Sequence, residues 1–139
     1  MAKILGIIGG GQLGMMLTEA AKSMPLDISK IIVLDPTENC PAVKVGAEQI
    51  VADFKDKSSI KELAERSDII TYEIESGDSA VLKSLESTCE INPSPETLRV
   101  IQDKLTQKKF LNDNNIPVAK FSEIPSRIEL EAKINEFGF

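Results

Sequence analysis

KILGIIGGGQLG, residues 3–14, is the stretch that decides the fold of this 139-residue chain. It opens with a short apolar run, Lys3–Ile8, of the kind that forms a buried strand. Gly9, Gly11 and Gly14 then follow the G-x-G-x-x-G spacing, in which glycines allow a tight turn and a close approach of the backbone to a ligand. Beyond them, apolar residues recur with helical spacing up to Met24. The segment therefore predicts a strand, a glycine turn and a helix.

The alternation of strand and helix continues along the chain. Lys30–Leu34 is a continuous apolar run, rich in β-branched residues, which is typical of a strand covered on both faces. A helix with Ser58 or Ser59 as its N-cap is expected next, and another follows around Leu82. The remaining strands are expected at residues 49–52, 68–73 and 90–92. This order predicts an α/β fold with an open parallel sheet and helices on both of its faces.

From Ser94 onward, helices and loops replace the strand–helix alternation. Ser94-Pro95 has the form of a helix N-cap followed by proline at the first helical position. A second helix is expected over residues 103–114, and a strand over Val118–Phe121. The last predicted helix begins with a capping box formed by Ser126 and Glu129.

Composition excludes several classes of function. The chain has 16 Lys and Arg against 22 Asp and Glu, for a formal charge of −6, so broad nucleic-acid binding is not expected. No apolar run approaches the length that crosses a bilayer, and the beginning of the chain has no signal-peptide pattern, so we expect a cytoplasmic protein. The absence of histidine excludes Ser-His-Asp and Cys-His catalysis and any histidine metal site. Cys40 and Cys89 lack metal or redox spacing and are interpreted as structural thiols.

The glycine turn is the first candidate binding site. It precedes a helix, and the N–H groups at a helix N-terminus favour an anion. In a dinucleotide-binding fold, Asp35 at the end of the second strand would take the ribose hydroxyls. The turn would equally suit another phosphate-bearing ligand, or Asp35 could simply begin a turn with Pro36. The spacing alone leaves these alternatives open.

Two pairs of charged residues are the next candidates. Glu73 and Glu75 are two residues apart on an extended segment, so they project to the same side at the carboxyl end of the fourth strand. Ligands of open α/β sheets bind at that edge, although solvated carboxylates would give the same pattern. Lys104 and Lys108 share one helix face, which is either a solvated basic surface or a phosphate contact.

Taken together, several motifs resemble those of a known family. They are GGGQLG (9–14), VLDP (33–36), TYEIE (71–75), NPSPETLRVIQDKLTQKKFL (92–111) and IPVAKF (116–121). Their order and spacing are similar to the amino-terminal part of the N5-carboxyaminoimidazole ribonucleotide synthases, the ATPase subunit of the phosphoribosylaminoimidazole carboxylase system. The resemblance implies a Rossmann-like pre-ATP-grasp domain over residues 1–93, a helical linker over 94–115, and an incomplete start of an ATP-grasp domain over 116–139.

The resemblance also implies an activity for the parent protein. Members of this family are ligases of purine biosynthesis that use ATP to activate bicarbonate, as carboxyphosphate, and carboxylate the exocyclic amine of 5-aminoimidazole ribonucleotide. Magnesium ions accompany the ATP, and the parent protein is implied to be a homodimer. An NAD(P)-binding domain of an oxidoreductase and a non-catalytic interaction module remain as alternatives.

Site residues follow from the matching motif positions. Gly11, Gln12 and Leu13 match the turn that meets the ribonucleotide, and Glu73 matches a substrate contact. Lys104 matches the basic residue that reaches ATP, where many relatives have arginine, while the roles of Glu75 and Lys108 stay open. The resemblance assigns no catalytic residue and no metal ligand within the chain. It places the remaining ATP and magnesium site beyond Phe139, so the 139-residue fragment is expected to be inactive.

Overall fold

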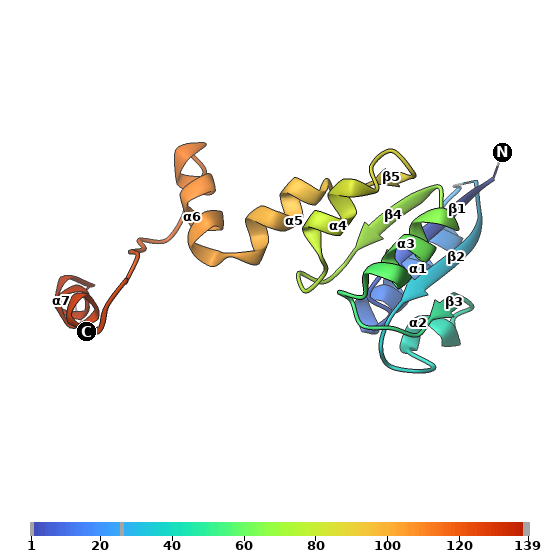
Figure 1. Ribbon diagram of the computed structural model, residues 1–139, viewed down its shortest axis with the longest axis horizontal. Coiled ribbons are helices and arrows are strands. Elements are labelled where there is room, and N and C mark those ends of the chain that lie inside the picture. Colours follow the sequence, from blue (N-terminus) through green and yellow to red (C-terminus); the bar gives the residue numbers. More distant parts are fainter. Residues whose placement is uncertain (1, 26, 138–139) are drawn as a thin grey trace. The chain divides into compact units, whose positions relative to one another are not determined.

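A computed structural model describes residues 2–25 and 27–137 of the chain (Figure 1). The chain divides into two compact units, residues 1–102 and 103–139. The strands of its sheet all belong to the first unit.

A five-stranded parallel sheet forms the centre of the first unit. Its strand order is β3-β2-β1-β4-β5. The strands are β1 (Lys3–Ile8), β2 (Ile28–Leu34), β3 (Glu48–Ile50), β4 (Ile69–Tyr72) and β5 (Glu90–Ile91). Every pair of neighbouring strands is parallel, so the expected open parallel sheet is confirmed. In the register, Ile8 lies opposite both Leu34 and Tyr72, which brings the carboxyl ends of the three central strands to one level.

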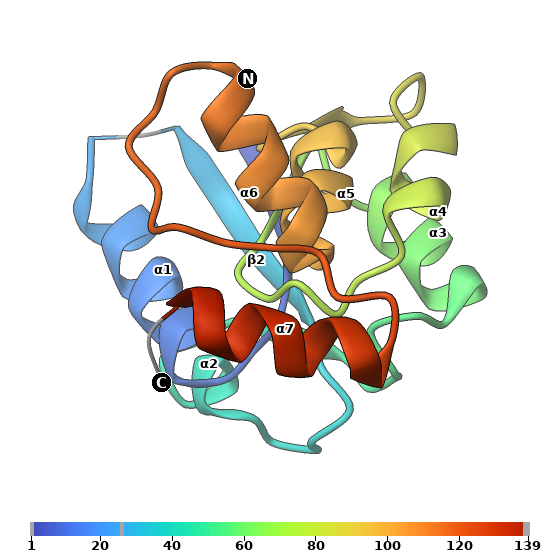
Figure 2. The ribbon, with the colours of Figure 1, turned by 90° about the vertical axis from the view of Figure 1, so that its left-hand side faces the viewer.

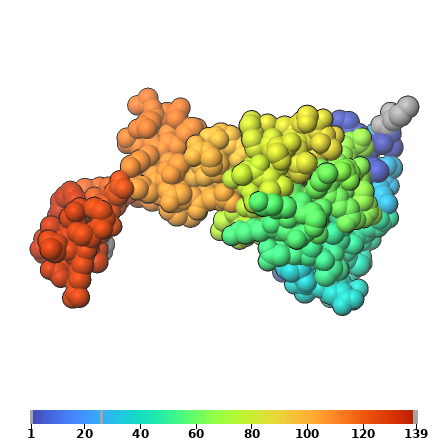
Figure 3. All heavy atoms as spheres, in the orientation of Figure 1, coloured from blue at the N-terminus to red at the C-terminus, as the bar shows by residue number. Residues whose placement is uncertain are grey.

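Helices cover both faces of this sheet, because successive side chains of a buried strand point to opposite sides. The helices are α1 (Gln12–Ser23), α2 (Pro41–Lys44), α3 (Lys57–Glu65), α4 (Ser79–Ser84) and α5 (Pro95–Gln102). Ile7 and Val33 pack in a cluster with residues of α1 and α2, whereas Ile8 and Leu34 pack in a second cluster with residues of α3, α4 and α5. Figure 2 shows β2 between α1 and the helices of the second cluster. In Figure 3, green and yellow atoms of α3 and α4 form the surface on that side. These two layers confirm the Rossmann-like α/β architecture.

The apolar residues of α1 lie differently from what their spacing suggests. The helix forms as predicted, but its buried positions are the small residues Gly14, Thr18 and Ala21. Leu13 and Met16 are 56% and 53% exposed, and Leu17 and Met24 are also exposed. The reason is the short glycine turn, which brings α1 so close to the sheet that only small side chains fit beneath it.

The N-cap of α3 is Asp56, and the expectation of Ser58 or Ser59 is wrong. The Asp56 carboxylate accepts hydrogen bonds from Ser59 N at 2.8 Å and from the Ser58 hydroxyl at 2.7 Å. These two bonds lower the pKa of Asp56, with the Ser58 hydroxyl as the largest cause. Asp56 serves because a carboxylate accepts more strongly than a hydroxyl, and both serines already lie inside the helix.

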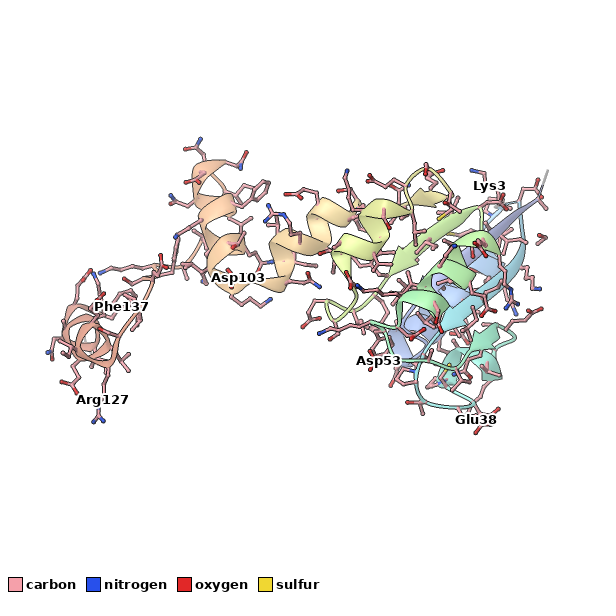
Figure 4. All side chains as sticks on the ribbon, in the orientation of Figure 1. Lys3, Glu38, Asp53, Asp103, Arg127 and Phe137 are labelled. Carbon is pink, nitrogen blue, oxygen red and sulfur yellow. The ribbon has the colours of Figure 1, made fainter. Side chains whose placement is uncertain are left out.

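The second unit contains the helices α6 (Lys104–Asp113) and α7 (Arg127–Phe137). Figure 4 labels Asp103, which directly precedes α6, and both ends of α7. Asp103 caps α6 by accepting from Thr106 N at 2.7 Å. The capping box of α7 forms only in part: Glu129 N donates to Ser126 Oγ at 3.3 Å as predicted, but the Glu129 carboxylate accepts from the Ser126 hydroxyl, where a full capping box uses the Ser126 backbone N–H. Val118–Phe121 is irregular, so the predicted strand is wrong for the described chain, which offers this segment no neighbouring strand to pair with.

Helix α5 belongs to the first unit by its contacts, since Leu98 is fully buried in the core that α3 and α4 share. The resemblance instead placed residues 94–115 in a linker. That division, at residues 93 and 115, stays a prediction about the domains of the protein.

Candidate functional site

The glycine turn, Asp35 and Glu73 directly follow the three central strands at their carboxyl ends. Backbone hydrogen bonds continue the sheet for one residue beyond β1 and for one residue beyond β4. Gly9 N donates to Leu34 O at 2.9 Å, and Glu73 N donates to Ile8 O at 3.1 Å. Parallel strands therefore place residues that are far apart in sequence beside one another at this edge.

Three of the glycines are required by the turn itself. Gly9 has φ of +105°, a left-handed conformation that side chains disfavour, and a Cβ there would lie 2.5 Å from Glu73 Oε1. A Cβ on Gly14 would overlap the carbonyl oxygen of Gly9, and one on Gly10 would overlap Cys40 Sγ. The fold thus depends on Gly10 as well as on the two motif glycines. The motif gave no signal for Gly10, because it treats that position as variable.

Gly11 differs from these three glycines. The nearest atom to a Cβ on Gly11 would be Glu73 Oε1, at 3.9 Å, which is an ordinary contact distance. Packing therefore does not require glycine at this position. Its missing side chain instead leaves open space between the start of α1 and the Glu73 carboxylate.

The N-terminus of α1 faces this open space without a side-chain cap. Gly11 is the N-cap residue, no side chain hydrogen-bonds there, and the first turn contains no acidic residue. A helix N-terminus carries a partial positive charge and backbone N–H groups that lack intrahelical partners. Gln12 and Leu13, the first two residues of α1, supply such groups, so this helix end can bind an anion.

Glu73 is a half-buried carboxylate beside the helix end. Its pKa is raised, first by burial, then by the negative charges of Asp35 and Glu75. Among the residues that the structure describes, none forms an ion pair with Glu73. Glu75 is exposed, yet its charge is close enough to contribute to this effect. A ligand that donates hydrogen bonds to Glu73 would relieve the unfavourable burial of its charge.

Asp35 has a structural role that the dinucleotide hypothesis did not foresee. It is 5% exposed, its Oδ2 accepts from Gly10 N at 2.8 Å, and its Oδ1 accepts from Thr37 N at 2.8 Å. Both carboxylate oxygens are therefore used to hold the glycine turn. This geometry does not present Asp35 to ribose hydroxyls.

Asp35→Asn is expected to lower the free energy of unfolding by about 2 kcal/mol, because the amide nitrogen would face a backbone N–H donor. Denaturant unfolding followed by circular dichroism measures this change. Asp53→Asn is the matched control, since the Asp53 carboxylate accepts from Lys55 N in its own exposed loop. Equal stability changes in the two variants would contradict the assigned role of Asp35.

Lys104 is the first residue of α6, in the second unit. Its Nζ is 3.5 Å from Gln107 Oε1. It lines a cavity of about 390 Å³ whose wall combines lysines with apolar residues of α6, α7 and the segment between them. Lys108 lines the same cavity, with Nζ 5.8 Å from the centre of the Phe121 ring. The expected shared face of Lys104 and Lys108 is thus present.

The described residues contain neither a metal-binding cluster nor a membrane-spanning helix. In residues 2–25 and 27–137, no group of three or more His, Cys, Asp or Glu side chains could hold a metal ion. None of the helices in the same ranges combines the length and apolar character needed to cross a membrane.

Comparison with known proteins finds consistent similarities. Residues 1–102 match the model of a family described as ribonucleotide synthetase preATP-grasp domain. The N5-carboxyaminoimidazole ribonucleotide synthase of Staphylococcus epidermidis is 38% identical over 135 residues, which are 97% of this chain and 35% of that protein. The crystal structure of the corresponding synthetase from Thermotoga maritima shares 48% identity, with a TM-score of 0.83 over 99% of this chain and 37% of that one.

A structure with bound nucleotides is also similar. It is the N5-carboxyaminoimidazole synthase of Aspergillus clavatus in complex with ADP and 5-aminoimidazole ribonucleotide. It shares 33% identity and a TM-score of 0.87, over 99% of this chain and 37% of that chain. The present chain therefore spans 35% to 37% of the length of these three proteins.

Proposed function

Because the chain belongs to the family of ribonucleotide synthetase preATP-grasp domains, we propose that it is the amino-terminal part of an N5-carboxyaminoimidazole ribonucleotide synthase. The whole enzyme is an ATP-grasp ligase of purine biosynthesis. It uses ATP and bicarbonate to carboxylate the exocyclic amine of 5-aminoimidazole ribonucleotide. Similarity to the bacterial synthases and to the ribonucleotide complex from Aspergillus clavatus supports this assignment.

The uncapped N-terminus of α1 beside Glu73 is the observation that carries the proposal. The N–H groups of Gln12 and Leu13 would receive the 5′-phosphate, because both charge and hydrogen bonding favour an anion there. Glu73 would accept hydrogen bonds from the ribose hydroxyls or the aminoimidazole amine, which would stabilise its charged form. Gly11 would give the ligand access to both groups.

Lys104 is the proposed contact of the chain with ATP. Its ammonium group offers a single charge, in contrast to the two-pronged contact that arginine makes with a phosphate. ATP supplies the energy that makes bicarbonate reactive toward the amine. Magnesium would accompany ATP. The described residues contain no group of three or more His, Cys, Asp or Glu side chains that could hold it.

Binding of 5-aminoimidazole ribonucleotide to the 139-residue chain tests the proposal, with Gly11→Ala as the probe variant. The added methyl group would occupy space between Glu73 and the helix N-terminus, so we expect the dissociation constant to rise by about tenfold. The free energy of unfolding should change by less than about 1 kcal/mol, because Gly11 makes no side-chain capping bond that the substitution would remove. Isothermal titration calorimetry and denaturant unfolding measure the two quantities.

Three outcomes would contradict the proposal. They are no ribonucleotide binding by the unaltered chain, equal binding by Gly11→Ala, and fluorescence-detected binding of NADH in place of the ribonucleotide. The last result would favour the oxidoreductase alternative.

We also propose that the chain alone does not turn over ATP, since it spans about a third of the length of its relatives. The homodimer and the cytoplasmic location implied for the parent protein stay predictions.

A further inference from the structure

The side chain of Gln102, the last residue of α5, reaches the loop that follows β4. Its Nε2 donates to Glu75 O at 2.8 Å and to Gly77 O at 2.7 Å. Its Oε1 accepts from Ser79 Oγ at 3.2 Å. One side chain therefore binds two residues of the loop and the first residue of α4, all more than twenty positions earlier in the sequence.

The chemistry of these partners determines which end of the amide faces the loop. The Glu75 and Gly77 carbonyl oxygens can only accept, so they need a group with two hydrogens to donate. The amide NH₂ group supplies both hydrogens, and the amide oxygen is left for the Ser79 hydroxyl. All three contacts are satisfied only in this orientation.

The loop that follows β4 packs against a buried residue of helix α5. Leu98 of α5 is fully buried in the core, and a Cβ on Gly77 would lie at a contact distance of 3.5 Å from Leu98 Cδ2. Helix α5 thus packs against the loop. Gln102 also hydrogen-bonds to the backbone on either side of Ser76, at Glu75 and at Gly77. Gln102 and residues 75–79 line a polar cavity of about 530 Å³, together with Lys55.

The held segment begins at the proposed substrate contact. Glu73 is the first residue after β4, and only Ile74 separates it from Glu75, whose carbonyl oxygen Gln102 binds. On the β1 side, Glu73 N is fixed by Ile8 O at 3.1 Å. The backbone around Glu73 is thus held by Ile8 on one side and, two residues later, by Gln102 on the other.

We propose that Gln102 is a positioning residue, which fixes the segment 73–79 so that the Glu73 carboxylate lies where ribonucleotide binding requires it. This inference rests on the proposed function of the glycine turn and Glu73. It goes beyond that function by giving α5 a part in substrate binding without contact between Gln102 and the substrate.

Three substitutions of Gln102 separate positioning from a general effect on folding. Gln102→Met removes all three hydrogen bonds, and Gln102→Glu places a carboxylate against two carbonyl oxygens. Both should raise the dissociation constant of 5-aminoimidazole ribonucleotide by about tenfold, the effect of one to two lost hydrogen bonds. Gln102→Lys keeps donors for both carbonyl groups, so its dissociation constant should stay within about threefold of the unaltered chain. Ser79→Ala, which removes only the contact to Oε1, should behave in the same way.

Amide NMR spectra of the ligand-free chain provide a second readout. Gln102→Met and Gln102→Glu should shift the amide resonances of residues 73–79 and speed their hydrogen exchange, whereas Gln102→Lys should leave them close to the original values. The core resonances of β1 and β2 should stay unchanged in every variant, which distinguishes a local effect from unfolding.

The outcomes separate this inference from the proposed function. If the unaltered chain binds the ribonucleotide and Gln102→Met and Gln102→Glu bind it equally well, only the inference about Gln102 fails. Equal loss of binding in Gln102→Lys would also overturn it. If the unaltered chain does not bind the ribonucleotide, the proposed function fails. In that case the NMR spectra still test whether Gln102 positions residues 73–79. Unshifted amide resonances in Gln102→Met and Gln102→Glu would contradict that role.

Discussion

Gly14→Ala is expected to lower the free energy of unfolding by about 3 kcal/mol. A Cβ on Gly14 would overlap the carbonyl oxygen of Gly9 and lie 3.0 Å from its carbonyl carbon. Both atoms belong to the backbone of the glycine turn, so a side-chain rotation cannot relieve the overlap. Helix α1 would have to move away from β1, opening the layer in which Thr18 and Ala21 are buried. Denaturant unfolding monitored by circular dichroism measures the change.

Gly11→Ala is the matched control for this prediction, because it makes the same change three residues earlier in the same turn. Its Cβ would meet no atom closer than 3.9 Å, so the loss should stay below about 1 kcal/mol. Similar losses in both variants would show that α1 does not pack closely on Gly9. The contrast also separates a glycine required for packing from one that gives a ligand access.

Glu73→Gln is expected to raise the dissociation constant of 5-aminoimidazole ribonucleotide by about a hundredfold, because it removes the charge from a hydrogen-bond acceptor in the proposed site. Isothermal titration calorimetry measures the constant. Glu38→Gln makes the same chemical change on an exposed residue of the loop after β2 (Figure 4) and should leave binding unaltered. Unchanged affinity in Glu73→Gln would remove Glu73 from the proposed site.

The same substitution should have the opposite effect on stability. The pKa of Glu73 is raised in the folded chain, mainly by burial, so the folded state binds its proton more strongly than the unfolded state does. As pH rises from the ordinary glutamate pKa through the raised value, this carboxyl group therefore reduces the free energy of unfolding. Glu73→Gln removes that loss.

Unfolding curves at several pH values test the sign of this effect. Glu73→Gln should be more stable than the unaltered chain above the raised pKa, and the difference should shrink as pH falls below the ordinary pKa of glutamate. A difference that grows toward acid would contradict the raised pKa. Ribonucleotide binding should weaken over the same range on acidification, because the protonated carboxyl group is a poorer acceptor.

Much of the fold could be predicted from local patterns in the sequence. Lys3–Ile8 has the predicted bounds, and β2 and β4 lie within two residues of their expected positions. Strands covered on both faces are continuous apolar runs, so their sequences show them clearly. The N-cap residues of α5 and α7, Ser94 and Ser126, were equally predictable, because each depends on residues within one turn.

Predictions that depended on neighbours elsewhere in the chain were less successful. Val118–Phe121 was expected to be a strand, but it has no strand to pair with in the described chain. The exposed apolar residues of α1 could not be inferred from their spacing. Helical periodicity shows that a face is apolar, but the distance between helix and sheet decides whether that face is covered.

The sequence by itself determined the parallel α/β fold, the glycine turn and the presence of Glu73 near the end of a central strand, since all three depend on local spacing. Only the tertiary structure decided that Asp35 holds Gly10 in place, that Gly10 and Gly14 are packing residues while Gly11 is open, and that Gln102 binds the loop after β4. The hydrogen bonds of Asp35 and Gln102 join residues 25 and 27 positions apart in sequence. They depend on the register of parallel strands and on the approach of each helix to the sheet, which are properties of the assembled layers and of no single segment.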